Sequence, residues 1–185
     1  MFTLELAKED FKFSSAHFTL FDAASGELLH GHNYQVAVRV SGYELDDLEL
    51  LVDLAALKER IRELCGELDS RTLLPARSPH LRVSITGGEV EVRFQSRRYL
   101  FPEADIRLLP LRNISVESLA RFLWGLLVER LGVVAAKPLE RLEVSVQETA
   151  GQSCWFSGSL RRAEPAEREE PRSRQGCPIG TREET

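Results

Sequence analysis

The chain has 185 residues, 43% of them hydrophobic and 29% charged, a composition that supports one globular domain with a buried core and excludes a wholly disordered chain. Its formal net charge of −5 comes without a block of basic residues, which argues against a nucleic-acid partner and favours a small-molecule substrate. No apolar run reaches the roughly 20 residues that a membrane span needs, and no basic segment followed by an apolar stretch opens the chain, so we predict a cytoplasmic protein without a membrane partner.

Two strands are predicted in the first 42 residues. Residues 2–17 alternate loosely between apolar and polar side chains, and residues 30–42 (HGHNYQVAVRVSG) alternate with period two. The residues on one face of this second strand are Tyr34, Val36, Val38 and Val40. Residues 21–29 (FDAASGELL) are small, polar and glycine-containing, so we predict a loop there and an antiparallel pairing of the two strands.

Two amphipathic helices are predicted further along the chain. The first covers residues 51–69, where Asp53 is a candidate N-cap. Its apolar residues recur every three or four positions, at Leu54, Leu57, Ile61, Leu64 and Leu68. The second covers residues 113–132, begins near Ser115 and ends at Gly132. Its predicted buried stripe consists of Leu119, Phe122, Leu123 and Leu126.

The segments around these helices predict further strands. Two prolines break the chain over residues 71–80, and residues 81–102 are typical of a hairpin that turns at Gly87 and Gly88. Residues 141–160 alternate again and supply the closing strand or strands.

The order of these elements predicts a single α+β domain over residues 1–161. Both helices are expected to cover one face of an antiparallel sheet, and other subunits are expected to bury its second face. From residue 162 to 185 the chain is charged and contains prolines with few apolar residues, which predicts a disordered tail.

A candidate metal site lies in the HGH sequence. His30 and His32 are two residues apart, so a strand directs both imidazoles to the same face. Adding His17 from the neighbouring strand gives three nitrogen ligands, the arrangement of a catalytic zinc site with a position left for water or substrate. The alternative is that these are ordinary polar strand residues. The fourth histidine, His80, follows a proline and is expected at the surface.

The cysteines predict neither a disulfide framework nor a cysteine zinc site. They are odd in number and show no CxxC spacing: Cys65, Cys154 and Cys177.

The ordered segments FSSAHF, HGHNYQVAVRVSG, LVDLAALK, LDSRTLLP, NISVESLA and VSVQET resemble the 6-pyruvoyl-tetrahydropterin synthase family, which includes the queuosine-pathway 6-carboxytetrahydropterin synthases. The resemblance spans residues 11–149. It implies a tunnelling fold (T-fold), in which trimers close their sheets into a barrel, two trimers stack into a homohexamer, and active sites lie between subunits. This assembly would supply the cover that the second face of the sheet needs.

The resemblance also implies roles for single residues. The family's zinc ligands match His17, His30 and His32. Glu148 matches the glutamate that anchors the pterin, for which a carboxylate is suited because it can accept hydrogen bonds from two N–H donors at once. Ser115 and Glu117 match the polar helix start that borders the pterin pocket, although helix capping alone would explain Ser115 equally well.

The chain departs from the family at the proton-transfer residues. Members that make pyruvoyl or carboxy pterins carry a cysteine before the HGH sequence and an Asp-His pair downstream, whereas here no cysteine precedes His30 and the pair reads Asp69-Ser70. Asp69 is retained as a candidate catalytic residue. Glu27, in the spacing ExxHGH, resembles the folate-pathway variant, in which a glutamate takes over the work of the cysteine.

That variant cuts 7,8-dihydroneopterin triphosphate to 6-hydroxymethyl-7,8-dihydropterin. The expected reaction is a retro-aldol cleavage in which zinc lowers the pKa of the side-chain hydroxyls, Glu27 takes a proton and the dihydropterin ring accepts the electrons. Four arginines are candidates for contacting the triphosphate, and the sequence does not choose among them: Arg71, Arg97, Arg98 and Arg112.

Two other functions stay open at this point. A 6-carboxytetrahydropterin or 6-pyruvoyl-tetrahydropterin synthase is the alternative within the family, and the missing cysteine counts against it. A zinc- and pterin-binding protein without catalysis is the alternative of another class, which the Asp69-Ser70 sequence favours.

Overall fold

The computed structural model describes residues 1–131 and 138–160. Its elements, in chain order, are β1 (Phe2–Leu6), β2 (Lys12–His17), β3 (His30–Gly42), α1 (Leu54–Leu68), β4 (Arg71–Pro75), β5 (Arg82–Thr86), β6 (Glu89–Phe94), β7 (Arg97–Pro102), the 3-10 helix η1 (Glu103–Asp105), β8 (Ile106–Leu109), α2 (Val116–Leu131), β9 (Arg141–Thr149) and β10 (Gln152–Ser159). The predicted helix end at Gly132 and the predicted tail of residues 162–185 lie outside the described residues.

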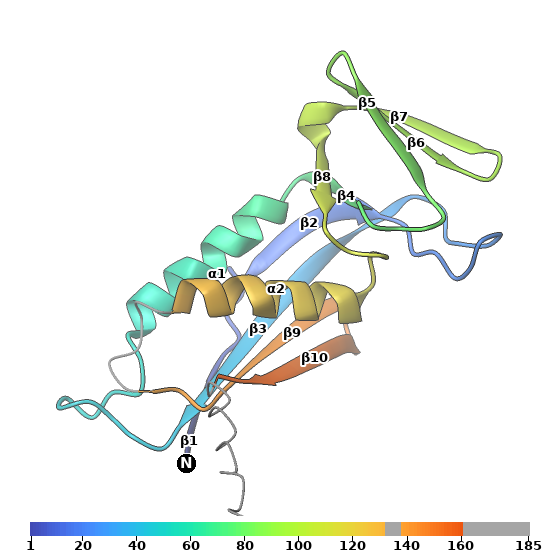
Figure 1. The fold of residues 1–185 in the computed structure, drawn as a ribbon. Helices are drawn as coiled ribbons and strands as arrows, with labels where there is room; N and C mark the ends of the chain where they lie inside the picture. Colours follow the sequence, from blue (N-terminus) through green and yellow to red (C-terminus); the bar gives the residue numbers. More distant parts are fainter. Residues whose placement is uncertain (132–137, 161–185) are drawn as a thin grey trace, which may run out of the picture.

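A curled seven-stranded sheet carries both helices on one face (Figure 1). The strand order is β10-β9-β3-β2-β4-β8, and β1 pairs with the far part of β3. This arrangement confirms the predicted α+β class. Within the described ranges, no helix is long and apolar enough to span a membrane.

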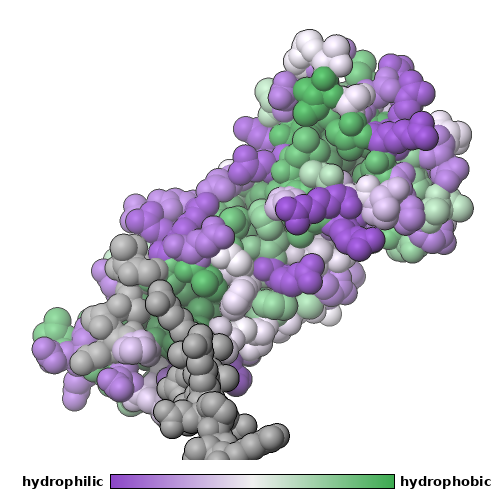
Figure 2. Space-filling view, viewed as in Figure 1, coloured by the Kyte–Doolittle hydropathy of each residue, from purple (hydrophilic) through white to green (hydrophobic). Residues whose placement is uncertain are grey.

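The main core lies between the two helices and the sheet. Tyr34, Val36, Val38 and Val40 are all buried on the helix side, as their period-two spacing predicts. The helix α1 begins where expected, because the Asp53 carboxylate accepts hydrogen bonds from Ala55 N and Ala56 N. The view in Figure 2 shows hydrophilic side chains along the outer surface of α1, opposite the buried stripe.

The buried stripe of α2 differs from the predicted one. Leu119 and Leu123 are buried as expected, whereas Phe122 and Leu126 are only partly buried. Ala120, Leu127 and Leu131 complete the stripe instead. The difference arises because α2 is apolar on more than one side, so that periodicity alone does not identify the side that faces the sheet.

Residues 71–75 form a strand, β4, where the sequence predicted only a break. This strand pairs in parallel with both β2 and β8, so the sheet is not antiparallel throughout. Leu73 is buried in the main core and Leu74 in a second core, which means that both faces of β4 are covered. A strand buried on both faces lacks the alternation that identifies a strand by sequence.

A small separate sheet follows, and the predicted hairpin is its first half. The strands β5 and β6 turn at Gly87 and Gly88 as expected, and β7 adds a third strand. The turn into β7 contains no glycine; Gln95 takes the left-handed conformation there, with φ 53°. The inner face of this sheet forms the second core with Phe18, Leu20 and Leu74. In Figure 2, apolar side chains are visible among charged ones over this region.

The packing of α2 on β10 depends on the absence of a side chain at Gly158. A Cβ atom there would lie 2.6 Å from Cε2 of Trp124, whose indole N–H donates to the carbonyl of Leu142. We expect Gly158→Ala to lower the free energy of unfolding by about 1–3 kcal/mol through overpacking. A Cβ atom added at Gly125, in α2, would have no neighbour within 4 Å, so Gly125→Ala is the matched control and should stabilise by about 1 kcal/mol. Urea unfolding of both variants checks this, and equal stability of Gly158→Ala and the parent would contradict it.

Candidate metal centre

Three histidines and one glutamate meet at the end of the sheet beyond the helices. In the antiparallel pair of β2 and β3, His17 lies opposite His30, and His32 follows on the same face. Glu148 comes from β9, the neighbour of β3 on its other side. One ligand atom from each of the four residues lies within 4.8 Å of all the others. The predicted histidine cluster is thus present, and Glu148 lies in it rather than at its margin.

Backbone carbonyls orient two of the imidazole rings. His17 Nδ1 lies 3.2 Å from the carbonyl oxygen of Ile114, and His30 Nδ1 lies 2.8 Å from that of Leu28. Because a carbonyl oxygen only accepts, each Nδ1 carries the proton and each Nε2 is left with a free lone pair. This is the tautomer that a metal-ligating histidine needs.

The Nε2 atoms of His17 and His32 are buried and have no hydrogen-bond partner among residues 1–131 and 138–160. Both lie close to Oε1 of Glu148, at 3.0 and 3.2 Å, yet neither contact has hydrogen-bond geometry. Buried polar atoms without a partner are costly and rare in folded proteins. A divalent metal ion would satisfy both lone pairs, so the donor set and its burial fit a metal site.

Burial also favours the metal-ligating form of His17. It lowers the pKa of the imidazole, and this effect exceeds the opposing pull of the Glu148 charge. The ring is therefore neutral near pH 7, as a ligand must be.

Two side chains fix the Glu148 carboxylate. Tyr34 donates its hydroxyl proton to Oε1 at 3.3 Å, and Gln152 donates to Oε2 at 3.0 Å. Burial, together with the Glu148 charge, raises the pKa of Tyr34, which keeps this hydroxyl protonated as a donor. Sequence reasoning missed both residues. The sequence could have indicated Tyr34, because it follows His32 by two residues and so lies on the same face of the strand. It could not have indicated Gln152, because the position of Gln152 beside Glu148 depends on how β9 and β10 pair.

Glu27 is held beside the histidines by Thr19. The backbone N–H of Thr19 donates to Glu27 Oε2 at 2.9 Å, and the Glu27 N–H donates back to the Thr19 carbonyl at 2.8 Å. Partial burial raises the pKa of Glu27, but the hydrogen bonds from Thr19, together with the charge that His30 and His17 carry when protonated, outweigh it, so the pKa is lowered. The carboxylate is therefore ionised near pH 7 and able to accept a proton.

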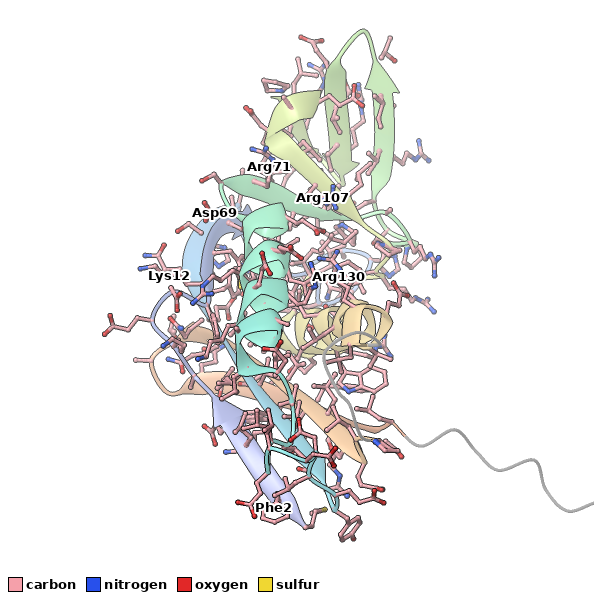
Figure 3. The ribbon with its side chains drawn as sticks, turned by 90° about the vertical axis from the view of Figure 1, so that its left-hand side faces the viewer. Phe2, Lys12, Asp69, Arg71, Arg107 and Arg130 are labelled. Atoms are coloured by element: carbon pink, nitrogen blue, oxygen red, sulfur yellow. The ribbon has the colours of Figure 1, made fainter. Side chains whose placement is uncertain are left out.

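The structure does not bring Asp69 into the cluster. Asp69 caps the C-terminal end of α1, as Figure 3 shows, and its Oδ1 accepts from the backbone N–H of Ser14 at 2.7 Å. The hydroxyl of Ser70 donates to Oδ2 at 3.0 Å. Ser70, the residue after Asp69, and His32 both line a cavity of about 530 Å³. A catalytic role for Asp69 stays a prediction.

Ser115 and Glu117 also lie outside the four-residue cluster. Ser115 acts as a helix cap: its backbone N–H donates to Ser118 Oγ at 2.9 Å, and its Oγ accepts from the Ser118 N–H at 3.3 Å. Glu117 lies in the first turn of α2. The carbonyl of Ile114, immediately before this cap, orients His17, so the start of α2 contributes to the metal centre through its backbone. The substrate-binding roles of Ser115 and Glu117 are not tested by these contacts.

Comparison with known proteins decides the family. The family model of 6-pyruvoyl tetrahydropterin synthase matches residues 5–159. The chain belongs to the 6-pyruvoyl tetrahydropterin synthase family. Members of this family are lyases that process pterins, so the chain is identified as a pterin-processing enzyme, in agreement with the resemblance of its motifs.

Individual relatives agree with this assignment. A protein of Methanocaldococcus jannaschii described as "Putative 6-carboxy-5,6,7,8-tetrahydropterin synthase" is 28% identical over 145 residues, which cover 78% of this chain and 88% of that protein. The solved 6-pyruvoyl tetrahydropterin synthase of Plasmodium falciparum is 27% identical with a TM-score of 0.81, over 86% of this chain and 98% of that one. A Plasmodium vivax variant, described as a catalytic-residue mutant with glutamate replaced by alanine, is 25% identical with a TM-score of 0.79 over the same shares of the two chains.

Metal content tests the cluster directly. We expect the purified protein to bind a divalent metal ion, and His32→Ala to lower that affinity by at least roughly 100-fold because one of the three imidazole ligands is lost. His80 is exposed and lies outside the cluster, so His80→Ala is the matched control and should bind metal as the parent does. Inductively coupled plasma mass spectrometry after dialysis against chelator measures both. Metal retained by His32→Ala would contradict the assignment.

The role of Asp69 at the end of α1 gives a pH dependence. The hydrogen bond from Ser14, followed by that from Ser70, lowers the pKa of Asp69 below its ordinary value of 3.8, so the ionised carboxylate stabilises the fold above that value. We expect Asp69→Asn to be less stable than the parent at pH 7 and the difference to vanish as the pH falls through the lowered pKa, where the parent also becomes neutral. Urea unfolding at pH 7, 5 and 3 checks this. Asp47, an exposed carboxylate, supplies the control Asp47→Asn, and a difference at pH 3 that is as large as at pH 7 would show that charge is not the cause.

Proposed function

We propose that this chain is a zinc-dependent lyase that cleaves the side chain of 7,8-dihydroneopterin triphosphate to give 6-hydroxymethyl-7,8-dihydropterin. The observation that carries the proposal is the Glu27 carboxylate, fixed by Thr19 within electrostatic reach of His30 and His17. The chain has no cysteine before His30 that could act in its place. The Plasmodium vivax variants, in which a catalytic glutamate is replaced by alanine or by cysteine, support a glutamate in this role.

The residues of the chain divide the work between binding and proton transfer. His17, His30 and His32 would hold zinc, which supplies positive charge that lowers the pKa of a substrate hydroxyl. Glu27, ionised, takes the hydroxyl proton, and the oxygen forms a carbonyl group as the carbon–carbon bond breaks. The electron pair of that bond passes into the dihydropterin ring, and a proton must then return to the carbon that remains attached to the ring.

Glu148 has a separate role in this proposal. Its carboxylate anchors the pterin by accepting hydrogen bonds from two N–H donors of the aminopyrimidinone edge. Tyr34 and Gln152 each bond to one oxygen of this carboxylate and so fix its orientation. In this proposal Ser115 and Glu117, at the start of α2, bind the pterin, and Asp69 serves the reaction from the end of α1, next to Ser70.

A 6-carboxytetrahydropterin synthase is the second candidate. The similarity to the Methanocaldococcus jannaschii protein supports it. Against it stand the missing cysteine before His30 and the serine at position 70, which removes the histidine of the usual Asp-His pair. A protein that binds zinc and pterin without turnover is the candidate of another class.

We further propose that the enzyme is a cytoplasmic homohexamer, a dimer of trimers. Within the described chain, β10 and β8 are the two ends of the sheet order, so each offers a free edge. Sheet edges are normally paired or protected, and closure of several sheets into a barrel would pair them.

The decisive experiment is incubation of the zinc-loaded protein with 7,8-dihydroneopterin triphosphate, with products identified by chromatography and mass. We expect the parent to form 6-hydroxymethyl-7,8-dihydropterin and Glu27→Gln to lose about 10²–10⁴-fold in kcat, because the amide cannot accept the proton. Glu27→Gln should keep its metal content and its affinity for pterin. Glu148→Gln should keep its metal and lose pterin affinity.

Each other outcome identifies a different protein. Carboxy- or pyruvoyl-tetrahydropterin as product would establish the second candidate and show that another residue replaces the cysteine. Tight pterin binding by the parent without any turnover would establish a binding protein. Loss of metal in Glu148→Gln would make Glu148 a fourth metal ligand instead of the pterin anchor.

A further inference from the structure

Side chains of the small sheet form hydrogen bonds with the loop that carries Glu27. Arg97, the first residue of β7, donates through Nη1 to the carbonyl oxygen of Glu27 and through Nη2 to that of Gly26, the latter at 3.1 Å. Two residues earlier, Gln95 donates through Nε2 to the carbonyl of Ala23. The loop is thus held at three carbonyl oxygens by two side chains from the turn between β6 and β7, which lies beside the loop in Figure 1.

The guanidinium of Arg97 is itself held in place. Arg97 pairs with Phe94 across the two strands, on the inner face of the small sheet, and its Cζ lies 5.8 Å from the centre of the Phe94 ring. Phe94 is 2% exposed and belongs to the second core. A planar guanidinium with this support presents two parallel N–H donors in a fixed orientation, a geometry that a lysine ammonium does not provide.

The same core fixes the other end of the loop. Phe18 stacks on Tyr99 of β7 with ring centres 5.6 Å apart, and Leu20 is buried against the same sheet. Asn113 donates to the carbonyl of Leu20 and accepts from its N–H, at 2.8 and 3.0 Å. Residues 18–20 are therefore anchored from two directions, and Thr19 between them binds the Glu27 carboxylate.

Arg97 is the donor to the carbonyl oxygens of Gly26 and Glu27, and the hydrogen bonds of the described residues include no second donor to either oxygen. Thr19 bonds to the Glu27 N–H and to Oε2, whereas Arg97 bonds to the carbonyls of both Gly26 and Glu27. Without Arg97, Thr19 would still hold Glu27, and Phe21, Asp22 and Gln95 would still bond to the tip of the loop, but the carbonyl oxygens of Gly26 and Glu27 would lose their side-chain donor.

We propose that Arg97 is a positioning residue: it fixes the Gly26–Glu27 backbone and so holds the Glu27 carboxylate at the histidine cluster. The inference rests on the proposed function, in which Glu27 is the base. It also removes Arg97 from the arginines that could meet a triphosphate, because its donors are directed to the loop carbonyls. Arg97 touches neither the histidines nor the carboxylate, so its effect passes through the loop.

The expected signature is a loss of kcat at unchanged KM. A reacting group displaced by 1 Å costs on the order of 10²-fold in rate, so we expect Arg97→Met to lower kcat by roughly 10- to 100-fold. Metal content and pterin affinity should stay at the parental level, because the residues proposed to hold them lie elsewhere. Arg97→Lys retains a charged donor nitrogen but not the two parallel N–H groups, and should recover part of the loss.

The matched control is Arg93→Met. Arg93 lies on the same small sheet, is exposed and pairs with Glu91 on the outer face. It should leave kcat, KM and metal content unchanged. If Arg93→Met lowers kcat as much as Arg97→Met does, the small sheet acts only through its overall stability and the positioning role is overturned.

Two measurements separate this inference from the proposed function. In the Glu27→Gln background, Arg97→Met should cost nothing further in residual kcat, because there is no base left to position; full additivity would overturn the inference. Amide hydrogen exchange of the peptide spanning residues 21–28 should be faster in zinc-loaded Arg97→Met than in the parent or in Arg93→Met. Unchanged exchange together with an inactive Glu27→Gln overturns the inference and leaves the proposed function standing, whereas a fully active Glu27→Gln overturns the proposed function and the inference with it.

Discussion

The register between β2 and β3 is the constraint on which the metal centre depends. His17 opposite His30 sets two rings with their centres 4.8 Å apart, and the period of two brings His32 to the same face. Side chains alternate strictly along a strand, so a slip of one residue would send His17 to the other face and leave the remaining ligands incomplete. The buried Phe13 and Tyr34, stacked at 4.8 Å further along the same pair, oppose such a slip because they would have to leave the core.

Backbone atoms orient the side chains of the site around this strand pair. The carbonyls of Ile114 and Leu28 set the histidine tautomers, and the N–H of Thr19 holds the Glu27 carboxylate. These donors and acceptors come from the start of α2, the end of the loop and the end of β2. Because a backbone group is supplied by every residue type, such support leaves little trace in the sequence, although it decides the chemistry of the side chains it touches.

The parts of the fold that could be predicted from sequence are those with a clear period. Leu57, Ile61 and Leu64 identify α1, and the alternation after His32 identifies β3. The strand β4 could not be recognised, because Leu73 and Leu74 are adjacent and both fully buried, one in each core. The third strand of the small sheet was missed because its turn uses Gln95 in a conformation more typical of glycine. In the site, short sequence spacings identified the three histidines and Glu27. The contact of Arg97 with Glu27 could not be predicted, because the two residues are 70 positions apart in the chain.

The burial of β4 on both faces links the two cores of the molecule. Leu73 and Leu74 are neighbours in sequence, but the first stabilises the layer of helices and the second the small sheet. The second core is the smaller of the two and includes Leu20 and Phe18, which precede the loop that carries Glu27, so it can open while the helices stay packed. We therefore expect the enzyme to lose activity on heating at a lower temperature than its helices melt, with recovery on cooling, since the main core remains as the template on which the small sheet refolds.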